Sequence, residues 1–213
     1  MIRLAISSIR LRRTIAATAA AGIAVAGLVV AAPVASAAPD ASILATYAVN
    51  GSTSIASTKS TMALGPGTLA ATLDVATGNF TANLDLPPAT GTFTELGFVP
   101  VTATTEFIQD APTTGKDVNG GIQSTSTITI KLTDVKVAGI DVPIGDSCQT
   151  SPATINLASD PGFNVLLGGN ISGTYTIPSF SNCGFTTFII NAIIPGSGNT
   201  IALTLGKPTV TIP

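Results

Sequence analysis

The side chains in this sequence that could do chemistry are two cysteines, eleven carboxylates and nine cations, and there is no histidine. Nucleophilic hydrolysis needs a serine or cysteine beside a base of suitable pKa. Without histidine, the nearest candidate is a dyad of Lys59 with Ser57 or Ser60. Because this segment is rich in Thr and Ser, we expect Lys59 to be solvated and protonated. A serine hydrolase is therefore not expected.

Paired carboxylates could serve a glycosidase or an aspartic hydrolase. Asp74 and Asp85 flank a predicted hairpin, but counting outward from its turn places Asp74 opposite residues 79–81, away from Asp85. Glu95, Glu106 and Asp110 lie near predicted strand ends, where a solvated acidic face explains them. We predict that the chain is not an enzyme and keep a carboxylate-based hydrolase as an alternative.

Oxygen ligands are what this chain offers a metal, which favours calcium over zinc. Asp141 and Asp146 bracket one predicted loop, and Asp110 and Asp117 bracket another. Neither pair matches the spaced Asp-x-Asp-x-Asp pattern of a calcium loop, and each is expected to cap a turn. We predict no metal site and no cofactor.

The positive charge is concentrated at the N-terminus. All four arginines (Arg3, Arg10, Arg12 and Arg13) precede an uncharged stretch over 14–39 that contains Ala35-Ser36-Ala37. A basic leader, an apolar centre and a small-x-small exit predict a signal peptide over 1–37. A retained membrane anchor is the alternative, and the export route, general secretory or twin-arginine, stays open. We expect the protein to be secreted or held in the cell envelope, with a membrane contact only through an uncleaved leader.

The two cysteines, Cys148 and Cys183, follow this leader, so they are expected where thiols oxidise. We predict a disulfide that closes a loop of 35 residues and stabilises the fold by roughly 3–4 kcal/mol. The remaining chain carries five lysines against eleven carboxylates, a net charge of −6. Because such a surface releases few counterions from nucleic acid, we expect no nucleic-acid partner.

Apolar and polar residues alternate with a period of two along the chain after the leader, which predicts β-strands. The clearest prediction is a hairpin of strands 69–75 and 80–86 with matched apolar faces. A change of parity near Thr133-Asp134 predicts a β-bulge, and 112–121 reads as a polar loop. Thr186–Ile194 is apolar on both parities, which indicates a central strand or, less well, a short buried helix. The other predicted strands are 99–109, 123–138, 154–157, 171–177, 199–205 and 209–212.

These strands predict one all-β domain over 38–213, an antiparallel β-sandwich or flattened barrel. Segments 64–69, 86–91, 98–104, 173–178 and 199–201, together with Cys148 and Cys183-Gly184, resemble small secreted actinobacterial proteins of unassigned function. The resemblance implies export by a bacterium and brings no catalytic residues.

The chain is also unusually apolar, with a mean hydropathy of +0.53 and only 9% charged residues, part of which comes from the leader. A well-filled β core is the simplest explanation. The alternative is an internal cavity or exposed apolar strip for a lipid or another envelope component. We predict a non-enzymatic exported bacterial protein with a binding or structural role in the envelope, for which a lipid or another apolar envelope component is the candidate ligand. A surface or adhesion module that recognises protein or glycan is the first rival.

Overall fold

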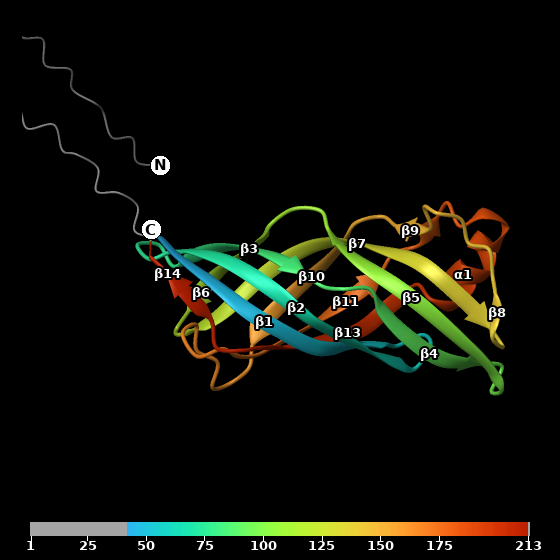
Figure 1. The fold of residues 1–213 in the computed structure, drawn as a ribbon, viewed down its shortest axis with the longest axis horizontal. Coiled ribbons are helices and arrows are strands. Elements are labelled where there is room, and N and C mark those ends of the chain that lie inside the picture. The colour runs from blue at the N-terminus through green and yellow to red at the C-terminus, as the bar shows by residue number, and fades with distance from the viewer. Residues whose placement is uncertain (1–41, 213) are drawn as a thin grey trace, which may run out of the picture. The chain divides into compact units, whose positions relative to one another are not determined.

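The computed structural model describes residues 42–212, which form an antiparallel all-β fold (Figure 1). The predicted leader, 1–37, lies outside the described residues. The elements are β1 Ser42–Ile55, β2 Ser60–Asp74, β3 Asn79–Asp85, β4 Ala89–Glu95, β5 Val99–Gln109, β6 Thr113–Val118, β7 Gly121–Val137, β8 Ile140–Asp141, β9 Gln149–Thr150, β10 Ala153–Ser159, β11 Gly169–Ile177, β12 Phe180–Ser181, a 3₁₀ turn (η1) Gly184–Thr186, α1 Thr187–Ile193, β13 Gly196–Leu205 and β14 Thr209–Thr211.

Eight of the strands close into a barrel in the order β7, β10, β11, β13, β1, β2, β3, β6 and back to β7. The ring closes at the first half of β7, which pairs with β6 through Thr125↔Thr114 and with β10 through Thr125↔Asn156. Closure leaves these strands without an exposed edge there. The prediction of an antiparallel all-β fold is confirmed.

The second half of β7 leaves the ring and pairs with β5, which pairs with β4. On its other side, β9 joins β7 to β12. Here β4, β5 and β7 form one layer and β1, β2 and β13 another. Side chains from both layers meet, since a Cβ on Gly91 of β4 would lie 3.5 Å from the Met62 side chain of β2. Both architectures expected from the sequence are thus present, a barrel at one end of the strands and two layers at the other.

The alternation read in the sequence sets which residues are buried. Ala45, Tyr47 and Val49 of β1 point into the fold and are at most 8% exposed. The predicted hairpin is confirmed as β2 and β3, with Leu69 opposite Leu84 and Leu73 opposite Phe80. Since β-strand side chains alternate between faces, this register places both apolar sets inside.

The predicted bulge is also confirmed. Thr105 of β5 pairs with Leu132, while Thr104 pairs with Asp134, so Thr133 is the extra residue of β7. The extra residue shifts the parity of β7, so that Val135 faces the interior as Leu132 does. The first half of β7 can therefore belong to the barrel, while its second half belongs to the layer formed with β4 and β5.

The prediction of a polar loop over 112–121 is wrong, because this segment contains β6. β6 and β7 form a hairpin whose turn residues Asn119 and Gly120 both have positive φ, 56° and 83°, as a two-residue Asn-Gly turn requires. The inward side chain of Thr113 donates a hydrogen bond to Ser126 Oγ. Because polar residues supply this inward face, the segment lacks the apolar alternation that marks the other strands.

The prediction of a central strand over Thr186–Ile194 is wrong as well. The segment forms η1 and α1, so the alternative of a short helix near the disulfide is closer, although this helix is buried on one side only: Ile190 is 7% exposed, while Phe188 is 83% exposed. Local hydrogen bonds explain the difference. The Thr186 hydroxyl donates to the Cys183 carbonyl, and the Asn191 side chain binds both backbone groups of Phe180.

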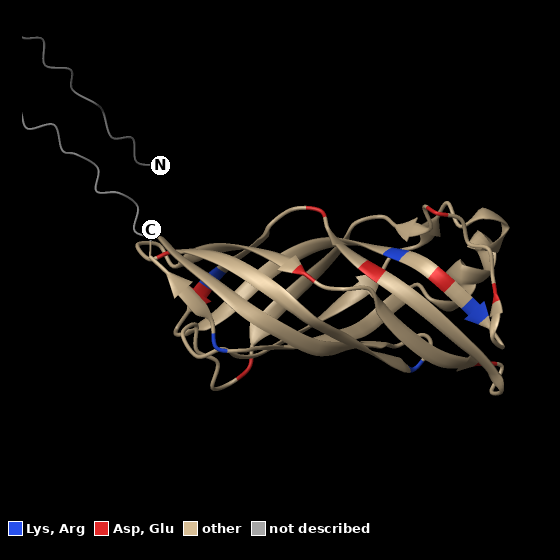
Figure 2. Cartoon of the chain, viewed as in Figure 1, with Lys and Arg blue, Asp and Glu red and all other residues tan. Residues whose placement is uncertain are grey.

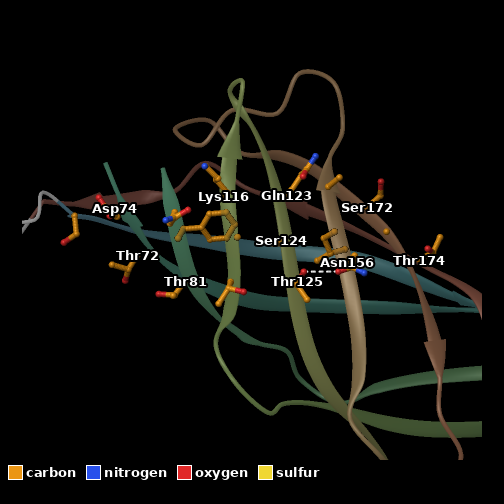
Figure 3. Close-up of a pocket in the computed structure, with 18 residues that line it drawn as sticks. Thr72, Asp74, Thr81, Lys116, Gln123, Ser124, Thr125, Asn156, Ser172 and Thr174 are labelled. Carbon is orange, nitrogen blue, oxygen red and sulfur yellow. Dashed lines mark hydrogen bonds between the residues drawn. The ribbon is translucent and has the colours of Figure 1, made fainter. Parts of the chain in front are cut away.

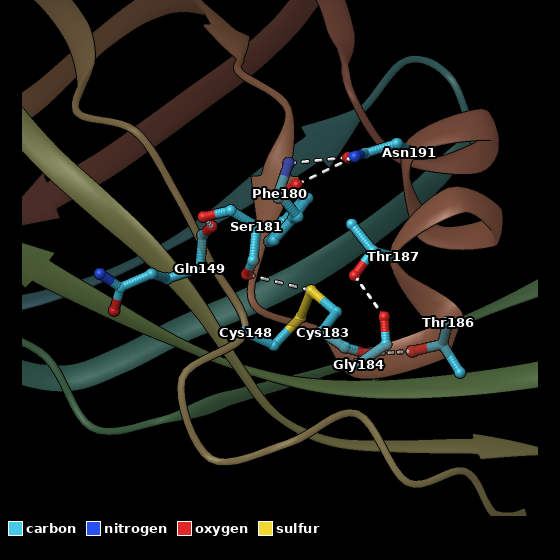
Figure 4. Close-up of a disulfide and its surroundings, with 9 residues drawn as sticks. All are labelled: Cys148, Gln149, Phe180, Ser181, Cys183, Gly184, Thr186, Thr187 and Asn191. Carbon is cyan, nitrogen blue, oxygen red and sulfur yellow. Dashed lines mark hydrogen bonds between the residues drawn. A yellow bond between two sulfur atoms is a disulfide. The ribbon is translucent and has the colours of Figure 1, made fainter.

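Cys148 and Cys183 form the predicted disulfide (Figure 4). Their Cα atoms are 4.3 Å apart, and both residues are fully buried. The bridge ties the loop before β9 to the residue that precedes η1. It therefore holds η1 and the following helix α1 beside the layer of β4, β5 and β7.

Candidate functional site

A mainly apolar hollow lies between α1 and the layer formed by β4, β5 and β7. We call it the α1 pocket, and its volume is about 430 Å³, within the range of small-molecule sites. Its lining residues are Phe93, Glu95, Leu96, Val99, Val101, Ala103, Val135, Val137, Val142, Ile144, Thr186, Ile189, Ile190, Ile193 and Ile194.

The β-bulge positions one wall of the α1 pocket. Val101 and Ala103 of β5 pair with Val137 and Val135 of β7, respectively. Directly opposed residues share a face of the sheet, so all four valine and alanine side chains line the pocket together. Without the extra residue Thr133, Val135 and Val137 would lie on the other face of β7.

The pocket offers almost no hydrogen-bonding groups to a ligand. Thr186 is 7% exposed, and its hydroxyl donates to the Cys183 carbonyl at 2.6 Å. Among the lining residues within 42–212, the acidic side chain of Glu95 is the single ionisable group. A polar molecule would lose its hydration here without replacement, and burying an unpaired polar group is costly. The pocket therefore suits a hydrocarbon chain.

Exposed hydrophobic side chains border the α1 pocket. Leu96 is 82% and Ile189 57% exposed, although both line it. Leu96 lies in the β4–β5 turn, where its φ is 52°, and Ile189 lies on α1. Burying a side chain of this size is worth about 1.5–3 kcal/mol. A ligand that covers both residues would gain part of this free energy.

Two smaller apolar hollows, one next to the α1 pocket and one inside the barrel, are also present in the described fold. One of about 50 Å³ shares Phe93, Ala103 and Ile194 with the α1 pocket and extends between the two layers. Another, of about 210 Å³, lies inside the barrel beneath Phe163 and Val165. There the Tyr47 hydroxyl donates to the Val165 carbonyl at 2.7 Å, and burial raises the pKa of Tyr47.

A different surface, lined mainly by polar side chains, hollows the outside of the barrel (Figure 3). It crosses β2, β3, β6, β7, β10 and β11 and has a volume of about 1070 Å³. Its geometry is distinct from that of the α1 pocket, since most of its side chains belong to the outward faces of the strands.

The structure places Lys59 in the β1–β2 turn, with a φ of 51° and its side chain exposed. The Ser57 hydroxyl donates to the Ile194 carbonyl at 2.7 Å, and the Ser60 hydroxyl bonds that of Thr58. These serine hydroxyls are thus engaged with other partners than Lys59.

The carboxylates considered for hydrolysis are spread over the fold (Figure 2). Asp85 pairs with Thr68, well away from Asp74 at the other end of the hairpin, as predicted. The Asp74 carboxylate accepts hydrogen bonds from the Thr77 hydroxyl and the Ala76 backbone, which lower the pKa of Asp74. Glu106 lies 3.6 Å from the Lys131 ammonium group.

Three of the four aspartates considered for calcium have hydrogen-bonding partners in the described part of the chain. Asp110 accepts a hydrogen bond from Thr129, and Asp117 accepts one from the Gly120 backbone, so Asp117 caps its turn as expected. Asp141 pairs with Lys136, and this hydrogen bond raises the pKa of Lys136. Within 42–212, the structure brings together no three acidic, histidine or cysteine residues that could hold a metal ion.

Comparison with family models, curated proteins and solved structures found no match for this chain. Neither helical segment of the described range has the length and hydrophobicity of a membrane-spanning helix. The sequence did not predict the α1 pocket, because part of its wall is formed by the segment 186–194, which is helical where a strand was expected. The bulge at Thr133 was the signal that could have indicated a second apolar face.

Proposed function

We propose that this chain is a non-enzymatic binding protein, exported to the envelope or the medium, that holds the hydrocarbon part of a neutral lipid in the α1 pocket. The observation that carries the proposal is the pocket itself, an open hollow of about 430 Å³ in which Glu95 and Thr186 are the polar residues among the described lining. A tightly filled core would have left no such space, since protein interiors are close-packed.

The charge at the pocket favours a neutral ligand over a fatty acid. Glu95 lines the pocket next to the exposed Leu96, so a ligand headgroup at this border would meet an acidic side chain. Two like charges about 4 Å apart repel by about 1–4 kcal/mol near a protein surface. An alcohol or ester headgroup avoids this repulsion.

The proposal is tested with the fluorescent probe N-phenylnaphthylamine and its displacement by cetyl alcohol or by palmitate. We expect the probe to bind, and cetyl alcohol to displace it at about tenfold lower concentration than palmitate, which corresponds to about 1.4 kcal/mol. Glu95→Gln should reduce this difference. Absence of probe binding by the folded protein would refute the proposal.

Two variants of α1 separate the pocket from general surface hydrophobicity. Ile189→Glu places a charge on a lining residue that is already 57% exposed, so the variant should fold and lose probe binding. Phe188→Glu is the matched control, because Phe188 is 83% exposed and outside the lining. Equal loss of binding in both variants would show that the probe binds to exposed apolar side chains instead of the pocket.

A further inference from the structure

The hollow on the outside of the barrel is built from three cross-strand rows of residues. One wall is an outward-facing row in which Thr72, Thr81, Thr114, Thr125, Asn156 and Thr174 pair successively across six strands. The other wall is the row Asn79, Lys116, Gln123, Ala158 and Ser172, which continues to Asp74 and Ser42 at the barrel end. We call this surface the polar trough.

The floor of the polar trough is the row between these walls, Phe80, Gly115, Ser124, Leu157 and Gly173, whose side chains point into the barrel. Two of its members are glycines. A Cβ on Gly115 would overlap the Phe80 ring, and one on Gly173 would overlap the Asn156 carbonyl oxygen. Because neighbouring atoms occupy the space of the missing side chains, a larger residue would not fit at either position.

Uncharged hydrogen-bonding groups dominate the walls. Among the described residues, the Thr125 hydroxyl donates to Asn156 Oδ1 at 2.9 Å, and Ser172 donates to Asp160. Thr72, Thr81, Thr114 and Thr174 are exposed on the outside of the barrel. Their hydroxyls can bond water or the hydroxyls of a ligand, because each is both donor and acceptor.

The charges of the polar trough are few and balanced, since its described lining contains one lysine, Lys116, and one carboxylate, Asp74. A single lysine suits neither nucleic acid nor an acidic polymer. The strands that carry the walls are paired on both sides, so a peptide could not add a strand here. These observations favour an uncharged polymer rich in hydroxyl groups.

The repeat of the walls matches such a polymer. Neighbouring strands lie about 4.8 Å apart, and the threonine-rich row follows the curve of the barrel over six of its eight strands. This spacing is close to the length of one sugar ring along an extended polysaccharide. Successive sugars could thus meet the hydroxyls and amides of neighbouring strands that face the same side of the barrel.

We propose that the polar trough binds a neutral linear polysaccharide, at a site separate from the α1 pocket and independent of its ligand. Aromatic stacking is absent, since the Phe80 ring lies on the inner side of the wall. Affinity for a short oligosaccharide is therefore weak, with a Kd on the order of 1 mM. A long chain that engages several protein molecules gains avidity.

The test is native gel electrophoresis in gels that contain dextran, mannan, xylan or β-glucan, with alginate as an acidic polysaccharide. We expect at least one neutral polymer to slow the protein, and alginate to leave its mobility unchanged. The combined variant Thr81→Ala, Thr114→Ala and Thr125→Ala should raise the Kd at least about tenfold.

The matched control replaces three exposed threonines of β4 that lie outside the polar trough, Thr90, Thr92 and Thr94, and should keep full retardation. Thr114→Arg gives a second route, because it fills the middle of the trough from an exposed position. No retardation by any neutral polymer, or equal loss in trough and control variants, would overturn the proposal. Probe binding in the α1 pocket should be unchanged in every trough variant, so the two proposals fail separately.

Discussion

The disulfide offers the sharpest test of how this fold is held together. Replacing Cys148 and Cys183 by alanine in one variant removes the bridge without leaving a free thiol. The backbone bond from Leu132 N–H to the Cys148 carbonyl, 2.9 Å long, is independent of the bridge. The variant should therefore keep its strands and lose mainly the restraint on the unfolded chain.

The magnitude follows from the loop that the bridge closes. The two half-cystines are 35 residues apart, and in the chain-entropy model such a loop is worth about 4 kcal/mol at room temperature. Single domains unfold with only about 5–15 kcal/mol. Loss of the bridge should thus remove a large share of the stability.

The assay is equilibrium unfolding in urea followed by circular dichroism, with the oxidised protein, the double variant and the reduced protein in parallel. Reduction is the control for the substitutions, because it opens the bridge without deleting side-chain atoms. We also expect weaker binding of the probe in the α1 pocket, since η1 and α1 directly follow Cys183. If both bridge-free forms unfold within about 1 kcal/mol of the oxidised protein, the chain-entropy reasoning is wrong for this fold.

Two further predictions concern the barrel. Gly173→Ala should destabilise the protein by about 3 kcal/mol, the upper end of typical overpacking costs, because the new Cβ would overlap the Asn156 carbonyl. Gly91→Ala is the control, because its Cβ would lie at an ordinary distance of 3.5 Å from the Met62 side chain. Equal urea midpoints of the two variants would contradict this explanation. Burial raises the pKa of Tyr175 above 10.0, although its hydrogen bond with Thr53 lowers it in part. The neutral phenol is thus favoured by folding, so this contribution to stability is complete below the unfolded-state pKa and is lost as the pH rises through the folded-state value. Tyrosinate absorbance should rise at higher pH in the native protein than in guanidinium, and Tyr175→Phe should weaken the alkaline loss of stability; coincident native and denatured titrations would refute this.

Much of the sheet was predictable because strand alternation is a local property of the chain. The hairpin of β2 and β3, strand β5 and the bulge at Thr133 all appear where the sequence placed them. β1, β4 and the first part of β2 were missed. Small and hydroxyl residues weaken the alternation over 50–61, but Ala45, Tyr47 and Val49 of β1 do alternate. β6 was missed for a related reason, as its inward residues include Thr113 and Gly115 in place of large apolar side chains.

The candidate sites were less predictable than the strands. Each wall of the α1 pocket comes from a different part of the chain, with Val101 on β5, Val135 beyond the bulge and Ile190 on α1. The polar trough likewise depends on a register that joins residues from six strands. No local pattern encodes such distances, because they arise from contacts between remote segments.

The sequence alone determines three properties of this protein. Its strands alternate with a period of two, its two cysteines can pair with each other, and it has few side chains that transfer protons. Only the tertiary structure decides that the ring closes through β7 and β10, that Thr186–Ile193 is helical, and that an open apolar hollow remains beside it. The physical reason is that alternation depends on neighbours along one strand. Closure, helix position and cavity volume depend instead on which distant surfaces pack together, and here the buried disulfide and the cross-strand hydrogen bonds make that choice.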